Sequence, residues 1–211
     1  MLYSAGSVHD LSVDAADLCG LTWLGGELWF ADPVRRHVVP VDPETGSARP
    51  AVPCPGLRSG LATLHGHLLY AVGEGSELRV VDPESGAIVA SLGDFRHGEP
   101  VTGMESGRHG IWLGFRDSVE LRSTPHFDLM RRLPAPLGVT GVTVTDRYLV
   151  FSDSLGETIT VVDLLTERTV LSIRVDGRPT GITWDGTRLW YCDATYLRLR
   201  AIEVPGMVSV P

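Results

Sequence analysis

Residues 181–193 read Gly-Ile-Thr-Trp-Asp-Gly-Thr-Arg-Leu-Trp-Tyr-Cys-Asp, and four earlier segments of the chain repeat this pattern. Each copy has a glycine, an apolar residue, a small residue, a short turn and then an aromatic-rich strand that often ends in aspartate. The spacings between the repeated glycines are 40, 43, 38 and 40 residues. These glycines are Gly20, Gly60, Gly103, Gly141 and Gly181.

A period near 40 residues is typical of architectures with one four-stranded sheet in each repeat. The rest of the chain supports this interpretation, because its apolar runs are short, alternating and bounded by Gly, Pro, Asp and Ser. Five sheets arranged radially protect their strand edges by closing into a ring. We therefore predict an all-β, five-bladed β-propeller of four-stranded antiparallel blades, folded as a single domain over residues 1–211.

The repeats place the blade boundaries and the closure of the ring. Residues 8–13 precede Gly20 as an outer strand precedes each later glycine, so we predict that this N-terminal segment completes the last blade. Residues 207–210 compete for the same place. The predicted repeats are about 20–59, 60–102, 103–140, 141–180 and 181–211, and the other predicted outer strands are 48–52, 87–92, 130–133 and 169–175.

Two turns have a recognisable chemistry. Residues 42–46 read Asp-Pro-Glu-Thr-Gly, and residues 82–86 read Asp-Pro-Glu-Ser-Gly. Asp can cap such a turn, Pro presets φ and Gly supplies a positive φ. These carboxylates are therefore assigned to structure.

Composition excludes several classes of function. The net charge is −8, and the 18 basic residues, all arginine, are scattered along the chain, so we expect no nucleic-acid partner. Without lysine the chain offers no Schiff-base nucleophile. No apolar run is long enough to span a bilayer, and the N-terminus lacks the pattern of a signal peptide. Three cysteines without metal-type spacing fit a reducing compartment, and we expect a cytoplasmic protein with no membrane partner.

The phrase at 181–193, together with Val-Asp-Pro-Glu-Thr-Gly at 41–46, resembles the superfamily of NHL, YVTN and gluconolactonase-like propellers. Within it, the five-bladed glutamine cyclotransferases are similar in blade number. The resemblance implies the propeller fold over nearly the whole chain. Gluconolactonase-like enzymes hold a divalent ion with glutamate, asparagine and aspartate, but this chain has no asparagine; the Asn-Glu-Leu-Glu phrase of the cyclotransferases is also missing.

Polar residues that depart from the repeat are candidates for function, because residues that all copies share are expected to build the blade. Arg58 stands where the other copies have Leu18, Val101, Val139 and Pro179. Glu105 replaces a threonine or alanine two places after its glycine. The two side chains either form one buried ion pair or hold a carboxylate substrate beside a general base.

The loop at residues 94–100 is the longest of its class and joins an imidazole to carboxylates. His97 is a candidate general acid or base near neutral pH, with Glu99 or Asp94 orienting it; a solvated loop histidine is the alternative. Arg116 and Arg178 are candidate anion-binding groups on the same face. Phe115 and Tyr196 complete the predicted substrate-binding set.

Three copies end their second strand with an aspartate: Asp32, Asp153 and Asp193. They are candidate ligands of a divalent cation, Ca²⁺ or Mg²⁺, although capping of a turn explains their shared position as well. In the other two copies the equivalent residues are apolar, which favours an organic ligand near this edge.

From these residues the sequence predicts an enzyme that acts on a small metabolite or peptide by lyase, cyclase or hydrolase chemistry, with its pocket at the mouth of the central channel. The alternative is a non-catalytic scaffold that binds a protein or ligand through the loops on that face.

Overall fold

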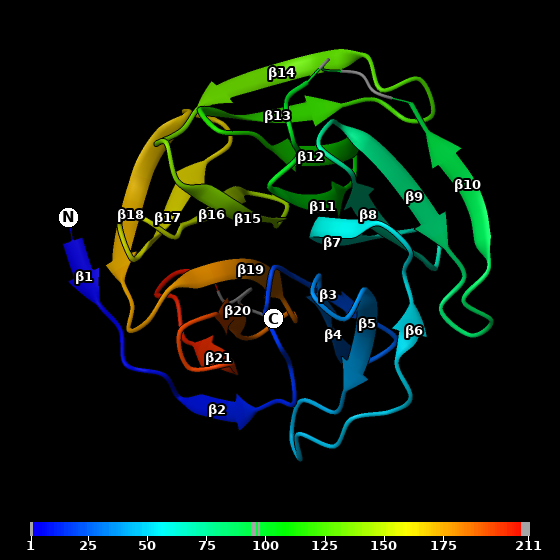
Figure 1. Cartoon of the computed structure of the whole chain (residues 1–211). Coiled ribbons are helices and arrows are strands. Elements are labelled where there is room, and N and C mark those ends of the chain that lie inside the picture. Colours follow the sequence, from blue (N-terminus) through cyan, green and yellow to red (C-terminus); the bar gives the residue numbers. More distant parts are fainter. Residues whose placement is uncertain (1, 94–95, 97, 208–211) are drawn as a thin grey trace.

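In the computed structural model, which describes residues 2–93, 96 and 98–207, the sheets stand around a central axis as the blades of a propeller (Figure 1). Over these residues the chain forms five sheets and no helix. The predicted five-bladed, all-β fold is confirmed. No helix of the described chain is long and apolar enough to cross a membrane.

Within each blade the strands follow one another antiparallel from the axis outward. Blade 1 contains β3 (Gly20–Leu24), β4 (Glu27–Asp32), β5 (His37–Val41) and β6 (Val52–Pro53). Blade 2 contains β7 (Leu57–Leu64), β8 (His67–Val72), β9 (Glu77–Val81) and β10 (Ile88–Leu92). Blade 3 contains β11 (Gly103–Gly107), β12 (Gly110–Gly114), β13 (Ser118–Arg122) and β14 (Leu129–Pro134). Blade 4 contains β15 (Val139–Val144), β16 (Tyr148–Asp153), β17 (Thr158–Asp163) and β18 (Arg168–Arg174), and blade 5 contains β19 (Pro179–Trp184), β20 (Leu189–Asp193) and β21 (Arg198–Ile202).

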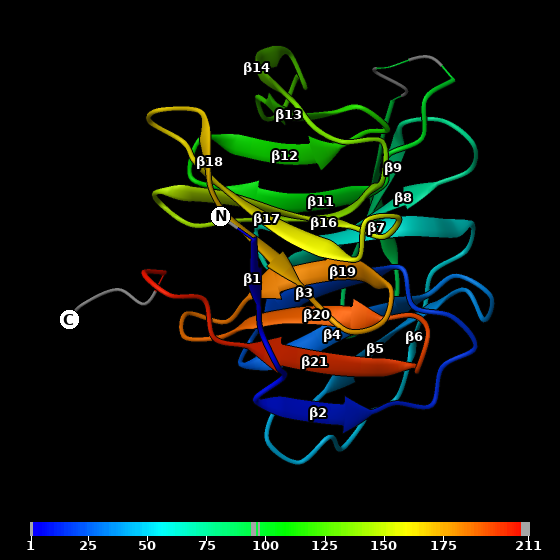
Figure 2. The same cartoon turned by 90° about the vertical axis from the view of Figure 1, so that its left-hand side faces the viewer.

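The N-terminal segment closes the ring as predicted. Strand β2 (His9–Ser12) pairs antiparallel with β21 and becomes the outer strand of blade 5 (Figure 2). The competing segment begins at Met207, which packs instead in the core between blades 4 and 5; residues 208–210 lie outside the described residues. Hydrophobic side chains of neighbouring blades meet in a core cluster at each junction, including the one between blades 5 and 1.

Two outer edges differ from the prediction. In blade 1 the prediction of an outer strand over residues 48–52 is wrong. The observed strand covers only Val52–Pro53, and Ala48 forms a single bridge to Val41. Pro50 lacks the N–H that a regular strand there would donate. In blade 4 a fifth strand, β1 (Leu2–Ser4), pairs parallel with the free edge of β18, which the sequence did not indicate.

The Asp-Pro turns have the predicted chemistry. The Asp42 carboxylate accepts the backbone N–H groups of Glu44 and Thr45 at 2.9 and 2.7 Å, and Gly46 has φ of 72°. Asp82 and Gly86 repeat this arrangement in blade 2. The backbone N–H donors hold the pKa values of both aspartates below their usual range.

Candidate functional site

The repeated glycines lie where the innermost strands of neighbouring blades touch. A Cβ atom on Gly20 would lie 2.8 Å from the backbone carbon of Gly60, and one on Gly103 would lie 2.7 Å from Cα of Gly141. A Cβ atom on Gly181 would lie 2.5 Å from the backbone carbon of Gly20. Glycine is therefore required because backbone meets backbone around the axis, and we call these five residues the glycine layer.

The residue directly before each glycine links one blade to the next. The Thr180 hydroxyl donates to the carbonyl of Leu18 at 2.7 Å, and the Thr140 hydroxyl donates to that of Pro179 at 3.0 Å. Ser59 donates to the carbonyl of Val101 in the same way. Thr102 departs from this pattern, because its hydroxyl is buried without a hydrogen-bond partner among the described residues. Together with Cys19, these residues form what we call the mouth layer.

We expect Thr180→Ala to destabilise the protein by about 1–2 kcal/mol, because it leaves the Leu18 carbonyl without its donor. Thr180→Ser keeps the hydroxyl and should retain most of the stability. Urea unfolding of both variants measures the difference. Equal stabilities of the two variants would show that the blade-to-blade hydrogen bond contributes nothing.

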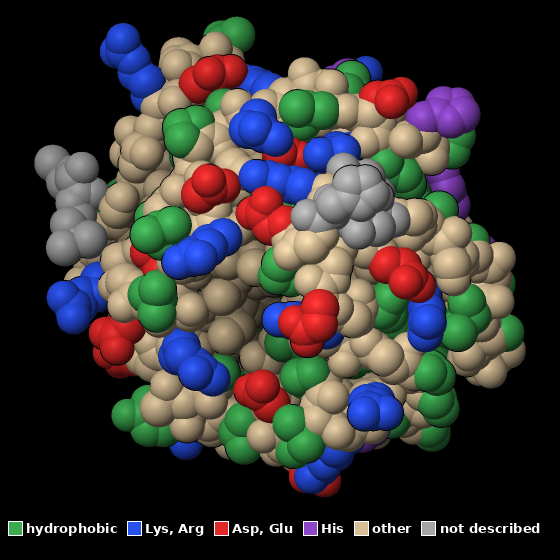
Figure 3. Space-filling model, turned by 45° about the horizontal axis from the view of Figure 1, so that its top comes forward, with side chains coloured by type: hydrophobic (Ala, Val, Ile, Leu, Met, Phe, Trp, Pro, Cys, Tyr) green, Lys and Arg blue, Asp and Glu red, His purple; other side chains and the backbone are tan. Residues whose placement is uncertain are grey.

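A pocket of about 250 Å³ opens above the mouth layer. All five mouth-layer residues line it. Arg58, at the start of β7, adds a charged group, and so do Asp17 and Arg178 from the loops that lead into β3 and β19. Figure 3 shows this face, where basic and acidic side chains surround a central hollow. The structure thus brings Arg58 and Arg178 to one pocket, as the sequence predicted, and adds Asp17, which no departure from the repeat had marked.

Both arginines keep part of their guanidinium group accessible. Arg58 pairs with Glu74, whose side chain is 93% exposed, and donates to the carbonyl of Gly73 at 3.2 Å. Arg178 lies 4.0 Å from the Asp17 carboxylate, with its side chain 54% exposed. Ion pairs this open to solvent are weak, so an anionic ligand can compete for the guanidinium groups.

Glu105 lies deeper on the axis, two residues past the glycine layer, and is buried. Its carboxyl oxygen Oε2 accepts hydrogen bonds from Thr143 at 3.1 Å and from Thr183 at 3.4 Å, in blades 4 and 5. The fully buried Thr22, its equivalent in blade 1, has a hydroxyl without a partner among the described residues. Burial raises the pKa of Glu105 to about 8, so the carboxyl group carries a proton at neutral pH.

The predicted Arg58–Glu105 ion pair is wrong, because the two side chains have the separate partners described above. Sequence spacing placed both on first strands, but Arg58 precedes its glycine whereas Glu105 follows its own. They therefore lie at different depths along the axis.

The remaining predicted substrate-binding residues do not line the mouth pocket. Phe115 is fully buried beneath the guanidinium group of Arg96, which lies 4.5 Å from its ring. Tyr196 is 60% exposed and stacks with Arg200 at 5.5 Å. Arg116 is exposed on the turn after β12.

Glu99, predicted as a catalytic residue, forms an ion pair with Arg96 at 2.7 Å. Arg96 also contacts Glu120, a completely buried carboxylate that Arg122 and Arg132 hold from β13 and β14. Sequence reasoning missed Glu120, although its acidic side chain departs from the apolar pattern of a buried third strand. His97 and Asp94 lie outside the described residues, so the catalytic role of His97 stays a prediction.

Asp32, Asp153 and Asp193 each organise the turn that follows their own strand. Asp153 Oδ1 accepts the N–H groups of Leu155 and Gly156 at 2.9 and 3.0 Å. Asp32 and Asp193 accept equivalent N–H groups and one further N–H from the loop before their first strand. This is the capping role that the sequence left open. Within the described chain no three potential His, Cys, Asp or Glu ligands lie together as a metal site would require.

A second, larger cavity of about 790 Å³ lies at the other ends of β11, β15 and β19, away from the mouth. Ser106, the neighbour of Glu105, lines it together with aromatic and arginine side chains of blades 3 to 5. No residue that departs from the repeat at the mouth points to this cavity in the sequence.

The chain matches no family model, and the comparison with curated proteins finds no match. Among solved structures, Myxococcus xanthus glutaminyl cyclase aligns over 96% of this chain and 97% of its own, with a TM-score of 0.80 and 10% identity. The TM-score shows that the two chains share the same overall fold. This agrees with the superfamily that the sequence resembles.

Two further propellers are more distant. A catalytically inactive Staphylococcus aureus virginiamycin B lyase with quinupristin aligns over 89% of this chain and 66% of its own, with a TM-score of 0.56 and 15% identity. A streptogramin B lyase aligns over 93% and 86%, with a TM-score of 0.56 and 14% identity. At these identities the likeness establishes the fold and not the activity.

Proposed function

We propose that this glutaminyl cyclase-like propeller is an enzyme of the lyase, cyclase or hydrolase type that takes a small anionic metabolite or peptide end at the mouth pocket. The observation that carries the proposal is the meeting of Arg58 and Arg178 above an otherwise uncharged mouth layer. Guanidinium groups recognise carboxylates by paired N–H donors.

The volume of the pocket narrows the substrate class. Pockets for drug-sized ligands occupy roughly 300–1,000 Å³, and the mouth pocket is smaller, at about 250 Å³. It suits a compound the size of an amino acid, or the terminal residue of a peptide.

Glu105 is the proposed proton carrier on the same axis. Lyase, cyclase and hydrolase reactions all move protons, and a carboxyl group with a pKa of about 8 can release and regain one near neutral pH. Arg58 would fix the anionic group at the mouth, and Glu105, which does not itself line the mouth pocket, would take up or release a proton deeper on the same axis. The fold neighbours include a cyclase and two lyases, which supports this range of reaction types.

Turnover of three model compounds tests the proposal: a dipeptide with N-terminal glutamine, a small lactone with a free carboxylate, and a cyclic ester peptide. We expect wild type to convert one of them, Arg58→Ala to raise KM with little change in kcat, and Glu105→Gln to lower kcat by about 100-fold or more. Arg168→Ala, which removes an exposed arginine outside both pockets, is the control. Conversion unaffected by either test variant, or none by wild type, would contradict the proposal.

A scaffold function has one observation in its favour. Leu155 and Tyr196 are 78% and 60% exposed on turns beside the mouth, and Val34 is 65% exposed on the equivalent turn of blade 1. A stable complex with a protein partner that Leu155→Glu disrupts, and that Leu165→Glu in the opposite cavity leaves intact, would favour the scaffold if no test compound is converted.

A further inference from the structure

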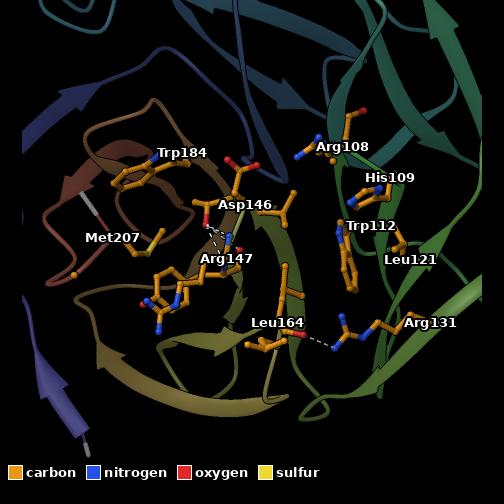
Figure 4. A pocket seen from close by; sticks show the side chains of 17 residues that line it. Arg108, His109, Trp112, Leu121, Arg131, Asp146, Arg147, Leu164, Trp184 and Met207 are labelled. Carbon is orange, nitrogen blue, oxygen red and sulfur yellow. Dashed lines mark hydrogen bonds between the residues drawn. The ribbon is translucent and has the colours of Figure 1, made fainter. Parts of the chain in front are cut away.

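The larger cavity, at the end of the axis opposite the mouth, has the dimensions of a ligand site. Its volume of about 790 Å³ is three times that of the mouth pocket, and it lies within the range of roughly 300–1,000 Å³ typical of small-molecule sites. Three blades contribute to it, because β11, β15 and β19 all end at its wall. Figure 4 shows the side chains that line it.

One wall of the cavity carries an indole N–H without an acceptor. The repeat gives Trp112 two equivalents: Trp29 donates to the carbonyl of Leu24 at 3.3 Å, and Trp190 donates to the carboxylate of Asp185 at 2.7 Å. No acceptor for Trp112 Nε1 is found among the described residues, although the surrounding blade is built in the same way. The indole N–H of Trp112 is therefore a hydrogen-bond donor available to a ligand at this wall.

A glycine in the adjoining turn removes the side-chain acceptor that blade 5 provides. Gly107 occupies the position that Asp185 has in blade 5, and a Cβ atom on Gly107 would lie 3.4 Å from Trp112 Nε1. Its missing side chain leaves the nitrogen edge of the indole uncovered, on the side of His109 in Figure 4. The turn that covers the equivalent tryptophan in blade 5 is thus open in blade 3.

The charges at the cavity favour an anion. Arg147 lies 3.0 Å from the Asp163 carboxylate and Arg131 lies 2.6 Å from that of Glu167, so each of these guanidinium groups already has an acidic partner. Arg108 is exposed on the same turn as Gly107 and forms no ion pair with any described residue. Asp146 also lines the cavity, and Figure 4 shows its carboxylate on the side of Arg108.

The apolar part of the lining is aromatic. Trp184 and Tyr148 are partly exposed at the cavity, and Leu164 and Met207 complete its apolar surface. Such side chains stack with a flat ring and contribute most of the contact area in small-molecule sites.

We propose that this cavity is a second ligand site, separate from the mouth, for an aromatic organic anion. The ring system would lie against Trp184 and Tyr148. The carboxylate or sulfonate would accept hydrogen bonds from the Arg108 guanidinium group and the Trp112 indole N–H. The mouth pocket, at about 250 Å³, is too small for the same ligand.

Anilinonaphthalene sulfonate is a suitable probe, because it combines fused rings with a sulfonate and fluoresces when bound. Wild type should bind it saturably at one site. Arg108→Ala should weaken the affinity about tenfold, which corresponds to the loss of one charge-assisted contact. Gly107→Asp, which recreates the blade 5 arrangement and adds a negative charge, should abolish binding.

Two control variants and one further test variant make the experiment specific. Arg168→Ala removes the same charge outside the cavity, and Arg58→Ala alters only the mouth, so both should bind as wild type does. Gly107→Ala adds a methyl group without charge and gives a second test of the same turn should Gly107→Asp fail to fold. No saturable binding by wild type, equal affinity in Arg108→Ala, or a loss in Arg58→Ala alone would overturn the proposal.

Discussion

Between about pH 5 and pH 9 the wild-type protein should lose stability relative to Glu105→Gln, by a total of about 4 kcal/mol. The cause is the burial of Glu105, which raises its pKa from 4.5 to about 8 in the folded state. Between these two values the folded protein holds a proton that the unfolded chain has released. The contribution of the Glu105 carboxyl group to the free energy of unfolding is therefore fully present below about pH 4.5, and it is lost as the pH rises through about 8.

Urea unfolding of both proteins across this pH range measures the effect, because all other titrating groups contribute equally and cancel in the difference. The glutamine introduced by Glu105→Gln keeps the shape and the threonine contacts but cannot ionise. The plot of stability against pH for this variant therefore lacks the contribution of the carboxyl group. Glu84→Gln, at an exposed turn, should follow wild type at every pH. Parallel curves for wild type and Glu105→Gln would show that the carboxyl group is hydrated and not buried on the axis.

Gly181→Ala should lower the free energy of unfolding by more than about 4 kcal/mol, which is at the extreme for a single substitution. The added Cβ atom would lie 2.5 Å from the backbone carbon of Gly20 and 2.7 Å from its Cα atom. Backbone atoms cannot rotate away as a side chain can, so blades 5 and 1 must separate at the junction that closes the ring. The core shared by these two blades would loosen as well.

Chemical denaturation compares this variant with Gly6→Ala. Gly6 has no heavy atom within 4 Å of an added Cβ atom and no positive φ, so its substitution should change stability by less than about 0.5 kcal/mol. Unfolding of Gly181→Ala at a urea concentration close to that of wild type would mean that the inner strands do not meet at the glycine layer.

The structural role of repeated residues could be predicted because each copy provides a comparison for the others. Glycine, the small residue before it and the Asp-Pro turns recur at fixed spacing, and the structure gives all of them local or blade-to-blade contacts. Residues that depart from the repeat were correctly singled out as unusual. The partners of these residues could not be predicted, because a departure from the repeat shows only that a residue differs from its equivalents in the other blades.

Contacts across the axis show why the partners of these unusual residues could not be predicted. Glu105 bonds with Thr143 and Thr183, which lie 38 and 78 residues further along the chain. The depth of each side chain in the ring decides these contacts, so Arg58 and Glu105 could be paired on sequence grounds and yet lie apart. The uncovered edge of Trp112 likewise results from a glycine in a neighbouring turn and from the way three blades meet.

The sequence by itself determined the number of blades and the turns and favoured the N-terminal segment as the closing strand, because backbone hydrogen bonding and turn chemistry are local and recur with the repeat. Only the tertiary structure decided the proton on Glu105, the open ion pairs of Arg58 and Arg178, the edge pairing of β1 and the cavity opposite the mouth. These features depend on which surfaces of separate blades are brought together, and burial and electrostatic environment arise only after that packing.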